Sequence, residues 1–121
     1  MSKEIAEKYW SIIQKQNYKA LADLFMPDAI IDWPNTNERF TVEEFIHVNE
    51  VYPGNWKEEI TVILETPDGC VCECWVGNEE ISFYAISNLH VLDGKISYMR
   101  EYWCTNGRPP AWRAGKYEKD K

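Results

Sequence analysis

The amino-acid sequence predicts an α+β fold in which helices cover one face of a long antiparallel sheet. The first half of the chain carries apolar residues at helical spacing, and the second half consists of four strand-like segments separated by hairpin turn signals. Helices followed by consecutive strands are typical of this class. A chain of 121 residues is expected to form one domain, residues 1–121, with residues 105–121 as a C-terminal tail.

Two helices and a short strand are expected in the first third of the chain. The first helix should span residues 3–16, because one of its stripes is apolar and is formed by Ile5, Tyr9, Ile12 and Ile13. A short helix over residues 18–25 is expected to end before Pro27, and a strand over residues 29–33 is expected to stop at Pro34.

A third helix is expected over residues 41–52. Thr41 and Glu44 form a capping-box signature at its start, and Pro53 with Gly54 should end it. One face of this helix is formed by Phe45, Val48, Asn49 and Tyr52.

The second half of the chain predicts a meander of four strands. Their expected ranges are 58–65, 70–76, 81–92 and 95–104. Alternating residues of a strand share a face, so the last two strands indicate which side chains enter the core. The more apolar face of the third strand comprises Phe83, Ala85, Ser87, Leu89 and Val91. In the last strand Arg100 belongs in water, so Met99, Glu101 and Trp103 are expected to point inward.

An inward Glu101 is the most informative feature of the sequence. No Lys or Arg accompanies it among the inward residues, so burial should raise its pKa. Its expected hydrogen-bond partners are Ser87, Tyr9 and Asn49. Such a carboxylate is a candidate general acid or base, and Tyr9 is a second candidate catalytic residue that would donate a hydrogen bond to a ligand. The alternative is a structural carboxylate and a Tyr9 that only packs in the core.

Three segments carry a resemblance to a known family: residues 24–29 (Leu-Phe-Met-Pro-Asp-Ala), residues 32–34 (Asp-Trp-Pro) and the closing residues 94–103. From Ile5 to about Arg113 the chain resembles the nuclear transport factor 2-like superfamily, within it the SnoaL-like and ketosteroid isomerase-like proteins. The resemblance implies a cone-shaped, curved antiparallel sheet wrapped around three N-terminal helices, a cystatin-like α+β roll. It also implies a deep apolar pocket and a homodimer formed through the outer sheet face.

The resemblance transfers only part of the isomerase site. The family's pocket tyrosine matches Tyr9, whereas its general-base aspartate falls on Trp33, next to Asp32, and its second acid falls on Ser87. A one-residue step turns a side chain to the other face of a strand, so Asp32 is a poor substitute and steroid isomerisation is not expected. The closing Glu101-Tyr102-Trp103 resembles the cyclase-like members more closely.

The expected pocket has aromatic walls. Trp33, Trp56 and Trp103 would form a wall for a flat ligand, unless they serve only as ordinary packing. Cys72 and Cys74 lie on one strand face with Cys70 and are interpreted as small pocket-lining residues. A thiolate metal site that includes Cys104 is the disfavoured alternative. No metal or cofactor is expected. The predicted ligand-binding residues are Trp33, Asn35, Asn49, Tyr52, Trp56, Cys72, Cys74, Phe83, Ser87, Met99 and Trp103.

Composition narrows the function. The formal charge of −7 argues against a nucleic-acid partner, and no apolar run approaches membrane-spanning length. The lack of an apolar leader predicts a cytoplasmic location. The leading hypothesis is a small-molecule-binding protein for an apolar or planar ligand, with cofactor-free proton transfer by Glu101 as in a cyclase, isomerase or dehydratase. The alternative is a non-catalytic, dimeric binding or interaction module with a closed pocket.

Overall fold

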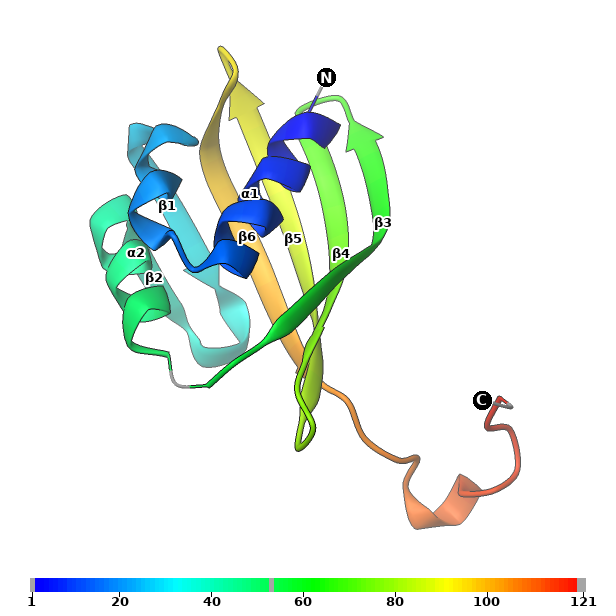
Figure 1. Ribbon diagram of the computed structural model, residues 1–121. Helices are drawn as coiled ribbons and strands as arrows, with labels where there is room; N and C mark the ends of the chain where they lie inside the picture. Colours follow the sequence, from blue (N-terminus) through cyan, green and yellow to red (C-terminus); the bar gives the residue numbers. More distant parts are fainter. Residues whose placement is uncertain (1, 53, 120–121) are drawn as a thin grey trace.

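Six strands of the described chain form one curved sheet, and the helices cover one of its faces (Figure 1). The computed structural model describes residues 2–52 and 54–119. Its helical elements are α1 (Lys3–Lys15), η1 (Tyr18–Asp23), η2 (Pro34–Thr36), α2 (Val42–Val51) and η3 (Ala111–Arg113), the η elements being 3-10 helices. Its strands are β1 (Phe25–Trp33), β2 (Glu38–Thr41), β3 (Lys57–Thr66), β4 (Gly69–Gly77), β5 (Ser82–Leu92) and β6 (Lys95–Thr105). The predicted α+β class is confirmed.

The start of α2 follows its sequence signal. The Thr41 hydroxyl accepts a hydrogen bond from the Glu44 amide at 3.2 Å, and the Glu44 carboxylate accepts one from the Thr41 amide at 2.9 Å. This reciprocal capping satisfies two of the amides that a helix start leaves unpaired. Pro53, expected to help end the helix, lies outside the described residues.

The region around Pro27 differs from the prediction. The expected second α-helix is the 3-10 helix η1, which ends two residues before the expected limit of residues 18–25, and Phe25 already belongs to β1. Pro27 therefore lies inside a strand instead of ending a helix. The strand tolerates it because the pairing of β1 with β6 is interrupted between Phe25 and Ile30, where no ladder amide is needed.

The sheet is mixed, whereas the sequence analysis expected it to be antiparallel. The strand order is β2-β1-β6-β5-β4-β3, and β1 runs parallel to β6 while the other neighbouring pairs are antiparallel. Hairpin turn signals report pairs of strands that follow each other, and β1 and β6 are far apart in the chain. The edge strand β2 was not predicted because its four residues include two charged ones, as is common at an edge.

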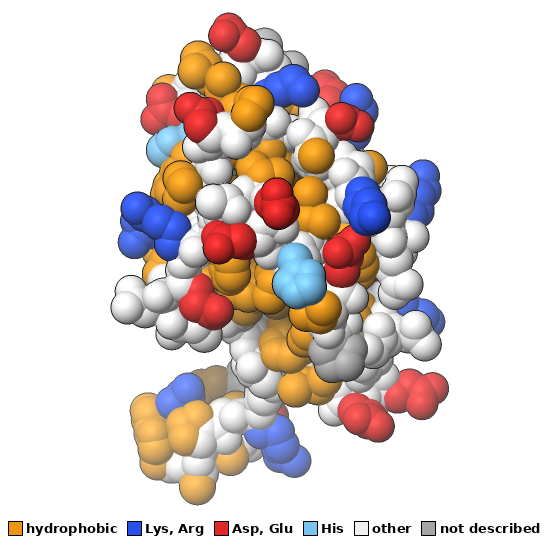
Figure 2. Space-filling view, turned by 90° about the vertical axis from the view of Figure 1, so that its left-hand side faces the viewer, with side chains coloured by type: hydrophobic (Ala, Val, Ile, Leu, Met, Phe, Trp, Pro, Cys, Tyr) orange, Lys and Arg blue, Asp and Glu red, His pale blue; other side chains and the backbone are white. Residues whose placement is uncertain are grey.

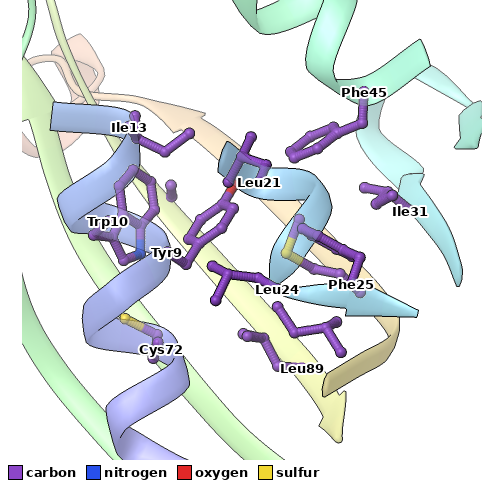
Figure 3. Packing of buried hydrophobic residues seen from close by; sticks show 14 of the residues in the cluster. Tyr9, Trp10, Ile13, Leu21, Leu24, Phe25, Ile31, Phe45, Cys72 and Leu89 are labelled. Carbon is purple, nitrogen blue, oxygen red and sulfur yellow. The ribbon is translucent and has the colours of Figure 1, made fainter. Parts of the chain in front are cut away.

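The helices leave a space between them above the sheet. α1 packs on β3 and β4, whereas α2 packs on η1 and β1. Figure 3 shows buried side chains of α1, η1, α2 and the strands packed against one another. Tyr9, Phe25 and Phe45 are among the largest fully buried side chains there. The two helices therefore form opposite walls of the region in which the sequence places its candidate site.

The C-terminal segment leaves the body of the protein. In Figures 1 and 2 it extends beyond the end of β6 and lies apart from the sheet and helices. It exposes two aromatic side chains, Trp112 and Tyr117, at 73% and 80% of their surface. Among the described residues, no helix combines the length and the apolar character needed to cross a bilayer.

Candidate functional site

A cavity of about 260 Å³ lies between α1, α2 and the sheet. Its lining comes from helices and strands far apart in sequence, so the fold alone assembles it. The lining includes nine of the residues predicted for the site: Tyr9, Trp33, Asn35, Asn49, Tyr52, Trp56, Phe83, Glu101 and Trp103. The fold thus brings these nine predicted residues to one cavity.

Glu101 is fully buried and accepts four hydrogen bonds. Its Oε2 accepts from the Tyr9 hydroxyl at 2.9 Å and from the Ser87 hydroxyl at 2.5 Å. Its Oε1 accepts from the indole N–H groups of Trp33 at 3.1 Å and Trp103 at 3.0 Å. A carboxylate has about four acceptor positions, so the protein itself fills all of them.

Burial and hydrogen bonding act on Glu101 in opposite directions. Loss of hydration raises the pKa of Glu101, and the donated hydrogen bonds of Ser87, Tyr9 and the two indoles lower it. Burial is the larger effect, so the predicted rise is confirmed in direction. Burial also raises the pKa of Tyr9 well above its ordinary value, and the neighbouring Glu101 adds to that rise. Tyr9 therefore stays a hydrogen-bond donor at neutral pH.

The predicted partner set of Glu101 is only partly right. Ser87 and Tyr9 donate to it as expected, Ser87 because it lies directly opposite Glu101 in the pairing of β5 with β6. The Asn49 amide does not: it donates to the Phe45 carbonyl one helical turn earlier, at 2.9 Å. The two indole donors were missed, although a buried indole N–H needs an acceptor, and parity had already placed Trp103 beside Glu101.

Aromatic rings form a continuous wall of the cavity. Trp33 and Trp103 lie 6.4 Å apart, centre to centre, at an angle of 73°, and Phe83 meets Trp103 at 6.0 Å and 82°. Trp56 lies 5.8 Å from Phe83 and stacks on Tyr52 at 5.2 Å with an angle of 3°. Edge-to-face contacts hold the rings at fixed angles, which gives the wall a defined shape.

Four predicted ligand-binding residues lie in the core outside the cavity lining: Cys72, Cys74, Ser87 and Met99. Each is fully buried. Ser87 reaches the site only through its hydrogen bond to Glu101, and burial raises the pKa of the Cys72 thiol to about 12, which keeps it protonated. The described residues contain no group of His, Cys, Asp and Glu side chains arranged to hold a metal ion.

Sequence analysis missed Glu58 on β3. Glu58 lines the cavity, and its Oε1 is shielded from solvent without a hydrogen-bond partner. Burial raises the pKa of Glu58 to about 7. Parity with Ile60, which packs on the core, could have indicated that Glu58 faces inward. The adjacent Glu59 is exposed, as the alternation of a strand requires.

A second, wider depression of about 1330 Å³ lies beside α2 and β1. All the charged side chains around it are exposed, including His47 and Lys95. It carries no buried titratable group among the described residues, in contrast to the cavity between the helices. The chemistry of the molecule is therefore concentrated in the smaller cavity.

Comparisons with known proteins give a clear answer for the fold. No protein-family model matches the chain. A candidate ketosteroid isomerase from Kribbella flavida superimposes with a TM-score of 0.84 at 23% identity, covering 99% of this chain and 90% of its own. An NTF-2 like protein of unknown function from Burkholderia xenovorans superimposes with a TM-score of 0.82 at 20% identity, covering 99% and 95%. The chain has the NTF2-like fold.

Another structure with this fold contains a small molecule. A hypothetical protein with a ketosteroid isomerase-like fold from Catenulispora acidiphila, in complex with trimethylamine, matches with a TM-score of 0.74 at 17% identity over 86% of this chain and 88% of its own. Among curated proteins, the serine/threonine-protein kinase ATR of Oryza sativa is 26% identical over 100 residues, which is 76% of this chain. The chain spans about 4% of the length of those kinases.

Two side chains that donate to Glu101 stand at positions where the resemblance to the isomerases implies acids. By resemblance, the isomerase acids correspond to Trp33 and Ser87, and both side chains here donate to Glu101. The neighbouring Asp32 belongs to another network: it pairs with Arg39 at 2.7 Å and accepts from the Tyr98 hydroxyl at 2.7 Å. The hydrogen bonds from Arg39 and Tyr98 lower the pKa of Asp32 to about 2. Asp32 is therefore not the base of this cavity.

Proposed function

We propose that this protein binds a compact, apolar or planar small molecule in the aromatic cavity, and that Glu101 with Tyr9 can move a proton there without a cofactor. The observation that carries the proposal is the cavity itself, in which aromatic walls surround a fully buried carboxylate. An apolar pocket with a few convergent polar groups and a perturbed pKa is the usual form of a small-molecule site. The fold gives general support, since it occurs in a candidate isomerase and in a protein bound to trimethylamine.

The size of the cavity restricts the ligand. About 260 Å³ lies just below the range of roughly 300–1,000 Å³ usual for drug-sized ligands. A molecule of one or two rings suits this space better than a four-ring steroid. This agrees with the loss of both isomerase acids at Trp33 and Ser87.

The hydrogen bonds of Glu101 direct the proton to one of its oxygens. The two indoles at Oε1 can only donate, so that oxygen cannot carry a proton without breaking a contact. At Oε2 the partners are hydroxyls, which can donate or accept. Tyr9 also lines the cavity, so a proton would pass between ligand and Glu101 through the Tyr9 hydroxyl. For any substrate found, Glu101→Gln should lower kcat by about 100-fold or more with binding nearly unchanged; unchanged turnover would remove Glu101 from the chemistry.

Binding is tested by filling the cavity. Val48 lines it from α2 and is half-buried, so Val48→Phe should occupy ligand space. Titration with 2-naphthol, followed by tryptophan fluorescence, should saturate in the wild type and be weakened at least about tenfold in Val48→Phe. Val62→Phe, at an exposed position of β3, is the matched control and should bind as the wild type does. Equal binding by all three proteins, or by none, would contradict the proposal.

A second candidate function is binding without turnover, in a homodimer formed through the outer sheet face. The observation favouring it is that the protein already fills every acceptor position of Glu101. On the outer face Trp75 lies directly opposite Tyr84 in the pairing of β4 with β5, and both are half-buried in one subunit. Sedimentation equilibrium should then give a dimer that Tyr84→Lys dissociates. A monomeric wild type would exclude this assembly.

A further inference from the structure

We propose that the molecule held in the aromatic cavity carries a positively charged nitrogen, a tertiary or quaternary ammonium group, which Glu58 and the surrounding rings recognise. This rests on the proposed function, because it names the chemical class of ligand that the same cavity takes. Three observations carry it: the sign of the charges in the lining, the unpartnered oxygen of Glu58, and the arrangement of the rings.

The charged side chains that line the cavity are all acidic. Glu38, Glu58 and Glu101 come from β2, β3 and β6, and no Lys, Arg or His belongs to the described lining. Low-dielectric walls that bear one sign of charge concentrate the electric field and attract the opposite charge. The formal charge of −7 on the whole chain adds to this attraction. An anionic ligand would be repelled, whereas a cation would be drawn in.

The three carboxylates differ in what they can offer a ligand. Glu101 is saturated by four protein donors, and the exposed Glu38 accepts from the Thr36 hydroxyl at 2.5 Å. Glu58 instead has a shielded Oε1 without a hydrogen-bond partner. A shielded carboxylate oxygen that lacks a partner is costly, and an ammonium group placed beside it would remove that cost.

The groups that face Glu58 provide no positive charge of their own. Tyr18 from η1 and Cys74 from β4 interact electrostatically with Glu58, and Glu101 from β6 lines the same cavity. Tyr18 and Cys74 both have a raised pKa, so both remain neutral at pH 7. The described lining thus holds no positive partner for ionised Glu58, and a cationic ligand would supply one.

The rings that line the cavity together with Glu58 would complete a cation site. Trp56 lies two residues before Glu58, stacks on Tyr52 and contacts Phe83. Aromatic faces attract organic cations, and the alkyl groups of a substituted ammonium pack on the same surfaces. A primary amine, which is strongly hydrated, would gain less from such walls than a substituted ammonium.

The inference is tested with two ligands of nearly equal shape, phenyltrimethylammonium and tert-butylbenzene. The first has a positively charged nitrogen where the second has a neutral carbon. By tryptophan fluorescence at pH 8.5, the cation should bind the wild type at least about tenfold more tightly than the hydrocarbon. Glu58→Gln should reduce this preference to about threefold or less and leave hydrocarbon binding within about threefold. Glu59→Gln removes an exposed charge from the next position and should keep the preference.

The pH dependence of cation binding provides an independent test. Phenyltrimethylammonium has no titratable group, so its affinity should rise between pH 5.5 and 8.5 as Glu58 ionises, and it should stay flat in Glu58→Gln. A cation that binds no more tightly than the hydrocarbon, or a preference that is undiminished in Glu58→Gln, would overturn the inference while hydrocarbon binding still supports the proposed function. A folded protein that binds neither ligand would overturn both.

Discussion

The β6 side and the β3 side of the cavity each present a carboxylate whose pKa is raised by burial, but the two carboxylates differ in their hydrogen-bond partners. Glu101 on β6 is held by two indoles and two hydroxyls, whereas Glu58 on β3 has an oxygen without any donor. Burial alone therefore does not identify a functional carboxylate. The hydrogen-bond partners distinguish Glu101, whose acceptor positions the protein fills, from Glu58, whose unpartnered oxygen we propose a ligand uses.

The largest loss of stability should come from removing the carboxylate of Glu101. Glu101→Ala leaves the donors of Tyr9, Ser87 and two indoles without an acceptor in the core, and should lower the free energy of unfolding by about 3 kcal/mol or more. Glu101→Gln should lower it less, because the hydroxyls can rotate to accept from the amide. Urea denaturation measures both. A loss below about 1 kcal/mol for the alanine variant would mean that Glu101 does not organise the core.

Replacing Glu58 should stabilise the protein at alkaline pH, whereas replacing Glu101 destabilises it. Because the pKa of Glu58 is raised to about 7, the folded state binds a proton more tightly than the unfolded state does. Its contribution to stability is thus complete below about pH 4.5 and is lost as the pH rises through 7. Partial exposure limits the loss to about 1–2 kcal/mol, so Glu58→Gln should be more stable than the wild type at pH 8 by that amount. Thermal unfolding at pH 4.5 and pH 8 tests this, and a variant equally stable relative to the wild type at both pH values would refute it.

The smallest effect is expected on the outer face. Arg39 and Tyr98 lower the pKa of Asp32 to about 2, so its ion pair stabilises the protein above about pH 4 and this is lost as the pH falls toward 2. Arg39 is largely exposed, so Asp32→Asn should cost less than about 1 kcal/mol at pH 7, and the difference should shrink at pH 3. Chemical denaturation at the two pH values measures it. A cost equal to that of Glu101→Ala would show that the outer network matters as much as the cavity.

The sequence predicted what depends on local pattern. The capping box of α2 and the inward direction of Glu101 both follow from residues close together in the chain, Thr41 with Glu44 and Arg100 with its neighbours. The parallel pairing of β1 with β6 joins distant strands, so no turn signal reports it. The indole of Trp33 reaches Glu101 only through that pairing. The unpartnered oxygen of Glu58 could not be predicted either, because the absence of a partner is a property of the whole packed structure.

The most direct measurement is an NMR titration of the side-chain carboxyl carbons in protein labelled with ¹³C-glutamate, with and without phenyltrimethylammonium. The account predicts that Glu58 titrates near pH 7, that the cation lowers this pKa, and that Glu101 titrates above its ordinary range and responds little to the cation. A Glu58 that titrates near its ordinary pKa of 4.5 and ignores the ligand would contradict the account.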